Sequence, residues 1–282
     1  MEFVTAALPD RKAFAAANGL SFEPIDVPTG FGGAVFEYLQ NKRVTDRFVA
    51  SSGPAFEVGN LTGSLGGSQP WLGTNGMVTT SFTSTEVRTY GYMAMQLERA
   101  LPQLVLDSTR NDSTFRSVAG GSSIPMPIAG GQRLTLEGDF NNHFALYAPA
   151  GYERDALYVF APDLMALLID ETGDFDVEIV DDMLFVYSTT PLDTSDTRVW
   201  DRLARIRTVV GGKAITQTDL YADDRSAAGT VTEHGQRLRM GFFGAGSGGF
   251  GKRLFWVVGG ILVLAFGTAA VIGFLVLGAA TR

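Results

Sequence analysis

Three residues that lie close together in the sequence could do acid–base chemistry: Glu137, Asp139 and His143. Two carboxylates and an imidazole could act as acid, base and orienting group, which would suit a hydrolase. A glycine and two asparagines lie among them, and these residue types favour turns because their side chains bond the local backbone. The stretch therefore predicts either a hydrolytic site or a structural turn, and the turn is the simpler interpretation.

Other acidic residues offer a second possibility. Glu178, Asp181 and Asp182 could bind a hard cation through oxygen ligands, although a hairpin turn explains the aspartates equally well. The chain has no cysteine, which excludes disulfides, thiolate chemistry and zinc sites built on sulfur. It has only two histidines, His143 and His234, so a metal site with several histidines is excluded too. We expect neither a metal nor a cofactor.

The charge distribution argues against nucleic acid as a partner. All 30 acidic residues precede residue 241, whereas three of the 22 basic residues follow it, so the earlier part carries a formal net charge of −11. Such a body is repelled by phosphate backbones and also by anionic lipid head groups. We expect it to stand off a membrane surface rather than lie on it.

The C-terminal part of the sequence predicts a membrane anchor. Residues 254–280 carry no charge and are rich in Leu, Ile, Val and Phe. As a helix, this run is long enough to cross a bilayer. Lys252 and Arg253 precede this run, and the positively charged flank of a span stays in the cytoplasm. The N-terminus lacks the basic and apolar pattern of a signal peptide. We therefore expect a single-pass, tail-anchored protein with its soluble body in the cytoplasm.

Small residues recur along one side of the predicted span. Ala265, Ala269 and Gly273 are spaced four residues apart, and small residues at this spacing let two membrane helices approach closely. The pattern suggests a homodimer formed through the span. Small residues are also common in membrane helices, so composition alone could produce it.

The rest of the sequence is divided by composition. We expect a soluble domain over residues 1–240, a tether rich in Gly and Phe over 241–253, and the span over 254–280. Short strand-like runs with a few helices, and no regular alternation of the two, predict an α+β fold with a mainly antiparallel sheet. The runs that end near Asp107 and Ser188 could be two similar halves of that sheet.

Local patterns predict the individual elements. We expect helices over 9–18, 163–171 and 197–210, where apolar residues recur at helical spacing or cap signals flank the run. The predicted strands lie mainly within 34–58, 79–107 and 133–148, with a short strand over 157–160 and a hairpin over 177–187. Residues 59–76 predict a loop because they are rich in Gly, Ser and Thr, and Gly211-Gly212 predicts the end of the last helix.

Three stretches between Leu97 and Ser188 carry a resemblance to a known family. They are LER…LPQLVLD from Leu97, LEGDFNNHFALYAP from Leu136 and YERDALYVFAPDLMALLID from Tyr152. This text resembles an actinobacterial-type family of bacterial single-pass membrane proteins that contain a domain of unknown function. The similarity covers about a third of the chain. It implies a location in a bacterial inner membrane and brings no activity or catalytic residues with it.

Two function classes follow from these observations. The first is a binding or scaffolding module, tethered to the membrane and facing the cytoplasm, with a protein partner of unknown identity. The second is a membrane-anchored enzyme of the hydrolase type that uses Glu137, Asp139 and His143. They differ in whether these three side chains converge in a pocket.

Overall fold

The structure is a computed structural model. It describes residues 3–8, 10–28, 30–65, 86–111, 123–126, 128–129, 131–136, 139–219, 221 and 235–240, and the backbone of 68–72 and 78–82. The predicted tether and the predicted span lie outside these ranges. Within them, none of the helices has the length and apolar character that crossing a membrane requires.

The chain divides into two compact units, and each is considered by itself. One unit comprises Met1–Met126 and Gly131–Arg239, and the other comprises Pro127–Gly130 and Met240–Arg282. In the second unit the structure describes only three residues, and Ile128 forms an isolated antiparallel bridge with Met240.

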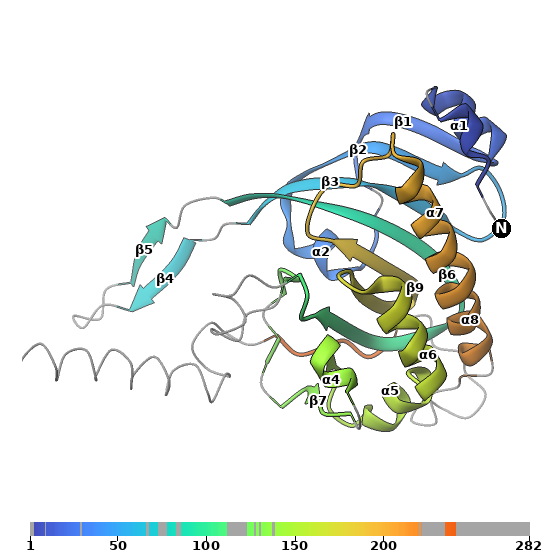
Figure 1. Ribbon diagram of the computed structural model, residues 1–282. Coiled ribbons are helices and arrows are strands. Elements are labelled where there is room, and N and C mark those ends of the chain that lie inside the picture. Colours follow the sequence, from blue (N-terminus) through green and yellow to red (C-terminus); the bar gives the residue numbers. More distant parts are fainter. Residues whose placement is uncertain are drawn as a thin grey trace, which may run out of the picture. The chain divides into compact units, whose positions relative to one another are not determined.

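The first unit is built on a seven-stranded antiparallel sheet (Figure 1). Its strands follow the spatial order β1-β2-β3-β6-β8-β7, and β9 pairs with β6 off this path. Their bounds are β1 Leu20–Asp26, β2 Gln40–Ala50, β3 Phe56–Leu65, β6 Glu86–Ser108, β7 Arg133–Leu134, β8 Phe144–Tyr147 and β9 Asp176–Ser188. A separate two-stranded sheet pairs β4, Ser68–Leu72, with β5, Val78–Phe82. These results confirm the predicted α+β class with an antiparallel sheet.

The two longest strands bend together. β6 and β9 pair from Gly91↔Ser188 to Leu106↔Val177, and the register shifts between Gln96 and Leu104. Asp181 lies at this bend with a φ of 53°, a left-handed conformation that Asp tolerates better than most residues. The predicted hairpin over 177–187 is therefore wrong. The residues form one bent strand, and both of its arms pair with β6.

Helices flank the strands along the chain. They are η1 Thr5–Ala7, α1 Arg11–Ala17, α2 Ala34–Tyr38, α4 Phe140–His143, α5 Glu153–Val159, α6 Pro162–Leu167, η2 Leu168–Thr172, α7 Thr197–Arg205, η3 Ile206–Gly211 and α8 Gly212–Thr218. The helix α1 begins after Asp10, whose carboxylate accepts hydrogen bonds from the N–H groups of Lys12 and Ala13. From α6 to α8 the helices pack on one face of the sheet and cover the main hydrophobic core.

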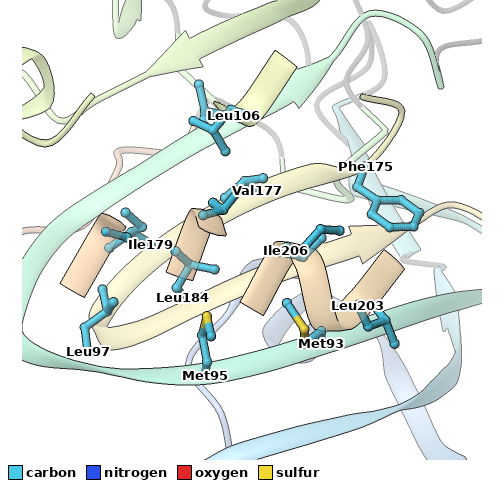
Figure 2. Packing of buried hydrophobic residues seen from close by; sticks show 14 of the residues in the cluster. Met93, Met95, Leu97, Leu106, Phe175, Val177, Ile179, Leu184, Leu203 and Ile206 are labelled. Carbon is cyan, nitrogen blue, oxygen red and sulfur yellow. The ribbon is translucent and has the colours of Figure 1, made fainter. Parts of the chain in front are cut away.

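Alternation along the strands separates two faces of the sheet. On the first face, Met93 and Met95 of β6 and Leu184 of β9 pack with Leu203 and Ile206 of α7 and η3 (Figure 2). Side chains at i and i+2 share a face, so Tyr92, Phe185 and Tyr187 lie on the second face. That face is covered in part by α2, where Phe36 contacts the rings of Tyr92 and Phe185.

Several local expectations require correction. Residues 34–38 form a helix rather than a strand, and the predicted short strand over 157–160 falls at the end of the helix α5, Glu153–Val159. Residues 59–65 belong to β3 rather than to a loop. Gly211-Gly212 does not end the last helix, which continues through η3 and α8 to Thr218. The predicted helices over 163–171 and 197–210 are confirmed. Leu164 and Leu168 on the first of them are buried, each with 1 % exposure, whereas Leu167 is only partly buried.

Candidate functional site

The predicted acid–base residues lie on the short helix α4 and beside it. The carboxylate Oδ2 of Asp139 lies 3.9 Å from Nε2 of His143, and a guanidinium nitrogen of Arg110 lies 3.4 Å from the other ring nitrogen. The Asp139 side chain is 79 % exposed, and the preceding Glu137 lies outside the described residues. Asp139 and His143 thus form a loose surface pair, and the structure does not test whether Glu137 joins it.

A surface depression lies elsewhere, next to α1, β1 and the start of α7. Its lining includes Arg11, Lys12, Phe22 and Thr197, and it contains neither Asp139 nor His143. Arg11 forms an ion pair with Asp46 at 2.7 Å. Among the described residues, no group of three or more potential ligands could hold a metal ion.

The most unusual ionisable groups lie behind the sheet, on the second face. Leu106 pairs with Val177, so Asp107 of β6 and Asp176 of β9 come at the next positions of the two strands. Asp107 is 4 % exposed and Asp176 is fully buried. The hydroxyl oxygen of Ser123 lies 3.0 Å from Oδ1 of Asp107 and 2.5 Å from Oδ2 of Asp176. A single hydroxyl group therefore bridges two buried carboxyl groups.

This bridge requires a proton on one of the acids. A serine hydroxyl has one hydrogen to donate, so it can donate to only one of the two carboxyl groups. The second carboxyl oxygen of Asp176, Oδ1, accepts hydrogen bonds from the Ser108 N–H and from the Asn111 amide, each at 2.8 Å. Burial, followed by the charge of Asp107, raises the pKa of Asp176 to about 8. The consistent arrangement is that Asp176 donates its proton to Ser123, which donates in turn to Asp107.

A second buried acid, Glu178, lies two residues further along β9. Its Oε2 accepts hydrogen bonds from the Ala34 N–H at 2.8 Å and from the Tyr187 hydroxyl at 2.9 Å, whereas Oε1 accepts from Gln103 Nε2 at 2.7 Å. Burial raises the pKa of Glu178 to about 7, and the hydrogen-bond donors oppose that rise. Each oxygen of Glu178 thus accepts from an N–H group, whereas the contact at Oδ2 of Asp176 is with the Ser123 hydroxyl, which can donate or accept.

The segment Gly235–Arg239, which we call the strap, runs across the same region. The Leu238 N–H donates to Gln103 Oε1 at 3.1 Å, and the Arg239 N–H donates to Gln132 Oε1 at 2.7 Å. Arg237 pairs with Asp181 at 2.8 Å, at the bend of β9. A Cβ atom on Gly235 would lie 1.7 Å from the Leu101 carbonyl oxygen, so only glycine fits this close approach. The strap is therefore fixed to the sheet by specific bonds.

The hydrogen bonds of the two buried acids, Asp176 and Glu178, connect elements of the fold to one another. Asp176 and Glu178 have no exposed surface, and their hydrogen bonds join β6, β9, α2 and the segment at Ser123. A general acid or base must come within hydrogen-bond reach of a substrate. Asp176 and Glu178 can retain protons near neutral pH, and neither side chain is exposed in this conformation.

The arginines of the last helix form local pairs. Arg202 contacts Asp174 at 2.5 Å and lies over the Phe175 ring, and Arg205 pairs with Glu171 at 3.3 Å. These contacts tie α7 to the segment that follows α6.

Sequence reasoning missed the Asp107–Asp176 pair because the two residues are far apart in the chain. One signal was available: Asp176 and Glu178 alternate with apolar residues in a strand, and both therefore occupy the same face. Cation binding by Glu178 with Asp181 and Asp182 gains no support, because Glu178 accepts three protein donors and Asp181 pairs with Arg237. The residues Ala265, Ala269 and Gly273 lie outside the described part of the chain.

Comparisons with known proteins add little to this geometry. No protein-family model matches the sequence, and no curated protein matches it. One solved structure is similar: the mycobacterial trehalose monomycolate transport factor A, TtfA, at 12 % sequence identity. The match covers 77 % of this chain and 97 % of that chain with a TM-score of 0.43. Similarity at this level supports no argument about the activity of this chain.

Proposed function

We propose that this chain is a non-enzymatic binding or scaffolding module, held to a bacterial inner membrane by residues 254–280, with its soluble body in the cytoplasm. The observation that carries the proposal is the long uncharged, apolar run at the end of an acidic sequence, preceded by Lys252 and Arg253. The internal bonding of Asp107, Asp176 and Glu178 supports a non-enzymatic role, because these acids stabilise the body instead of meeting a substrate.

Reporter fusions test the membrane part of the proposal. Green fluorescent protein fused before Met1 should fluoresce, and alkaline phosphatase fused after Arg282 should be active, because it folds only outside the cytoplasm. As a matched control, the phosphatase fused after Arg253 in a chain that lacks 254–282 should be inactive. An inactive phosphatase after Arg282 together with a dark N-terminal reporter would refute the orientation.

The hydrolase remains a second candidate because Asp139 and His143 are neighbours on the surface. A strain that lacks the chain can be complemented with wild type or with the variant Asp139→Asn/His143→Ala. Equal complementation at equal protein abundance supports the binding module. Failure of the double variant, at normal abundance and normal melting temperature, would support the hydrolase instead.

A further inference from the structure

The strap lies along one edge of β6, in a gap between two other strands. β6 pairs with β9 on its first edge, whereas its second edge pairs with β3 up to Met95 and with β8 from Val105 onward. We call the part of the second edge between these strands the β6 gap. There the Gln103 N–H donates to the carbonyl oxygen of Gln236 at 2.8 Å. The strap therefore bonds to a strand edge, which is a template for an added chain.

Two buried glutamine side chains also bond the main chain of the strap. Oε1 of Gln103 accepts from the Leu238 N–H at 3.1 Å. The side-chain amide of Gln132 donates to the Arg239 carbonyl oxygen at 2.8 Å and accepts from the Arg239 N–H at 2.7 Å. When a peptide is added to a sheet edge, main-chain hydrogen bonds of this kind supply affinity, and side-chain contacts decide which sequence fits.

Three residues of the strap meet such side-chain requirements. Arg237 pairs with Asp181 at 2.8 Å, and Leu238 is 5 % exposed. A Cβ atom on Gly235 would lie 1.7 Å from a main-chain oxygen of β6. The side chain of Gln236, in contrast, is exposed. The β6 gap thus fits a glycine, any residue, an arginine and an apolar residue in that order.

We propose that the β6 gap is a peptide-binding site and that the strap occupies it as an autoinhibitory segment. The ligand is an extended basic segment of a partner protein with the same pattern of glycine, any residue, arginine and apolar residue. The inference rests on the proposed function, because it names the ligand class of the binding module.

The chemistry of the gap favours a basic peptide over other ligands. Gln103 and Gln132 bond N–H and C=O groups of a peptide main chain, which lipid and nucleic acid lack. Asp181 requires a cationic side chain, and the formal net charge of −11 before residue 241 attracts cationic segments. Because the strap belongs to the same chain, its effective concentration at the gap is on the order of millimolar. A free peptide should therefore bind well only after the strap is weakened.

Peptide binding to the full chain in detergent micelles tests the proposal. The probe is a fluorescein-labelled peptide of residues 233–241, followed by fluorescence polarisation. The chain variant Arg237→Ala/Leu238→Ala removes two side-chain contacts of the strap and leaves the gap unchanged. We expect this variant to bind the probe about tenfold more tightly than wild type does, because the weakened strap competes less.

Two substituted peptides serve as matched controls, because they have the same charge as the probe. The Gly235→Ala peptide should bind the variant about tenfold more weakly than the probe, because its Cβ atom collides with β6. The Gln236→Ala peptide should bind as the probe does, since this side chain is exposed. Equal binding of the Gly235→Ala peptide would overturn the proposal, because charge alone would then attract the probe. Absence of binding to the folded variant would overturn it as well.

The fluorescence of the buried Trp200 reports whether the variant is folded. If the variant is unfolded, a second readout on an intact strap decides. The chain has no cysteine, so Gln236→Cys places a single spin label on the exposed side of the strap. Unlabelled probe peptide at roughly 1 mM should raise the mobility of this label, and the Gly235→Ala peptide should not. Unchanged mobility with both peptides would overturn the proposal.

These results separate the peptide site from the proposed function. Reporter fusions that refute the anchor leave peptide binding in micelles unchanged. Failed complementation by Asp139→Asn/His143→Ala refutes the non-enzymatic role whether or not the peptide binds. Absence of peptide binding, with the fusion and complementation results as expected, refutes only the site in the β6 gap.

Discussion

The change Asp176→Asn tests whether the buried acid pair holds a proton in the folded state. Asparagine has the shape of a protonated aspartic acid. Its carbonyl oxygen can accept from the Ser108 N–H and the Asn111 amide, while its amide donates to Ser123. The Ser123 hydroxyl then donates to Asp107 as before. The substitution therefore keeps the hydrogen bonds and removes only the ability to ionise.

The expected effect depends on pH in a defined direction. The pKa of Asp176 is about 8 in the folded state and 3.8 in a model compound, so the folded state binds more protons between these values. The wild type therefore loses stability as the pH rises through this window, by up to about 1.4 kcal/mol per pH unit for one retained proton. Between pH 5 and pH 7 the loss amounts to roughly 2–3 kcal/mol, and the variant does not suffer it.

The assay is urea unfolding of the full chain in detergent micelles, at pH 5 and pH 7. The chain has three tryptophans, and replacing Trp71 and Trp256 by Phe leaves the fully buried Trp200 as the reporter. At pH 5 the variant should unfold within about 1 kcal/mol of wild type, because its hydrogen bonds are conserved. At pH 7 the difference should move in favour of the variant by the amount given above.

The control Leu164→Ala removes no titrating group, so its stability difference from wild type should be the same at both pH values. If the Asp176→Asn difference were equally independent of pH, Asp176 would be ionised in the folded protein and the assignment of the shared proton would be incorrect.

Three further outcomes are expected. The change Glu178→Gln should destabilise the fold by roughly 1–3 kcal/mol, because in one orientation its amide meets Gln103 Nε2 and in the other it meets a backbone N–H; urea midpoints unchanged from wild type would contradict this. Leu164→Ala should cost about 2–5 kcal/mol, and an unchanged melting temperature would refute its place in the core. In a membrane two-hybrid assay, Gly273→Ile should abolish self-association of the predicted span whereas Val271→Ile should not; equal signals would reduce the small-residue pattern to composition.

The sequence predicts those elements whose apolar residues follow a clear period. The helix that begins at Thr197 was predicted because its apolar face is regular, but its end was misplaced at Gly211. Gly211 lies inside the continuous helical run of α7, η3 and α8, where a Cβ atom would lie 2.5 Å from the Met95 methyl group, so this glycine does not end the helix. Gly59 and Gly63 contributed to the incorrect prediction of a loop over 59–76. In the structure they lie in β3, where a Cβ atom would lie 3.0 Å from Val44 at Gly59 and 2.8 Å from Leu39 at Gly63.

Short apolar runs and long-range pairs were harder to predict. Residues 34–38 and 157–160 are too short for their period to distinguish a helix from a strand. The contact between Asp107 and Asp176 depends on the pairing of β6 with β9, and that pairing joins segments that are separated in the chain by β7, α4, β8, α5, α6 and η2. The exposed pair Asp139 and His143 was found because both residues lie within one turn of chain. The local sequence pattern therefore predicts the proximity of Asp139 and His143, but not that of Asp107 and Asp176.

The long strand β6 also constrains the order in which the body can fold during synthesis. Its middle pairs with β3, which precedes it in the chain, and with β9, which follows it, so Met93 and Met95 can pack with Leu184, Leu203 and Ile206 only after those residues have left the ribosome. Until then an apolar strand with one open edge is exposed to other chains, which is the condition that favours aggregation and recruits chaperones. Nascent fragments that stop before Asp176 should therefore be poorly soluble, and the complete body should fold slowly for its size because its decisive contacts are distant in sequence.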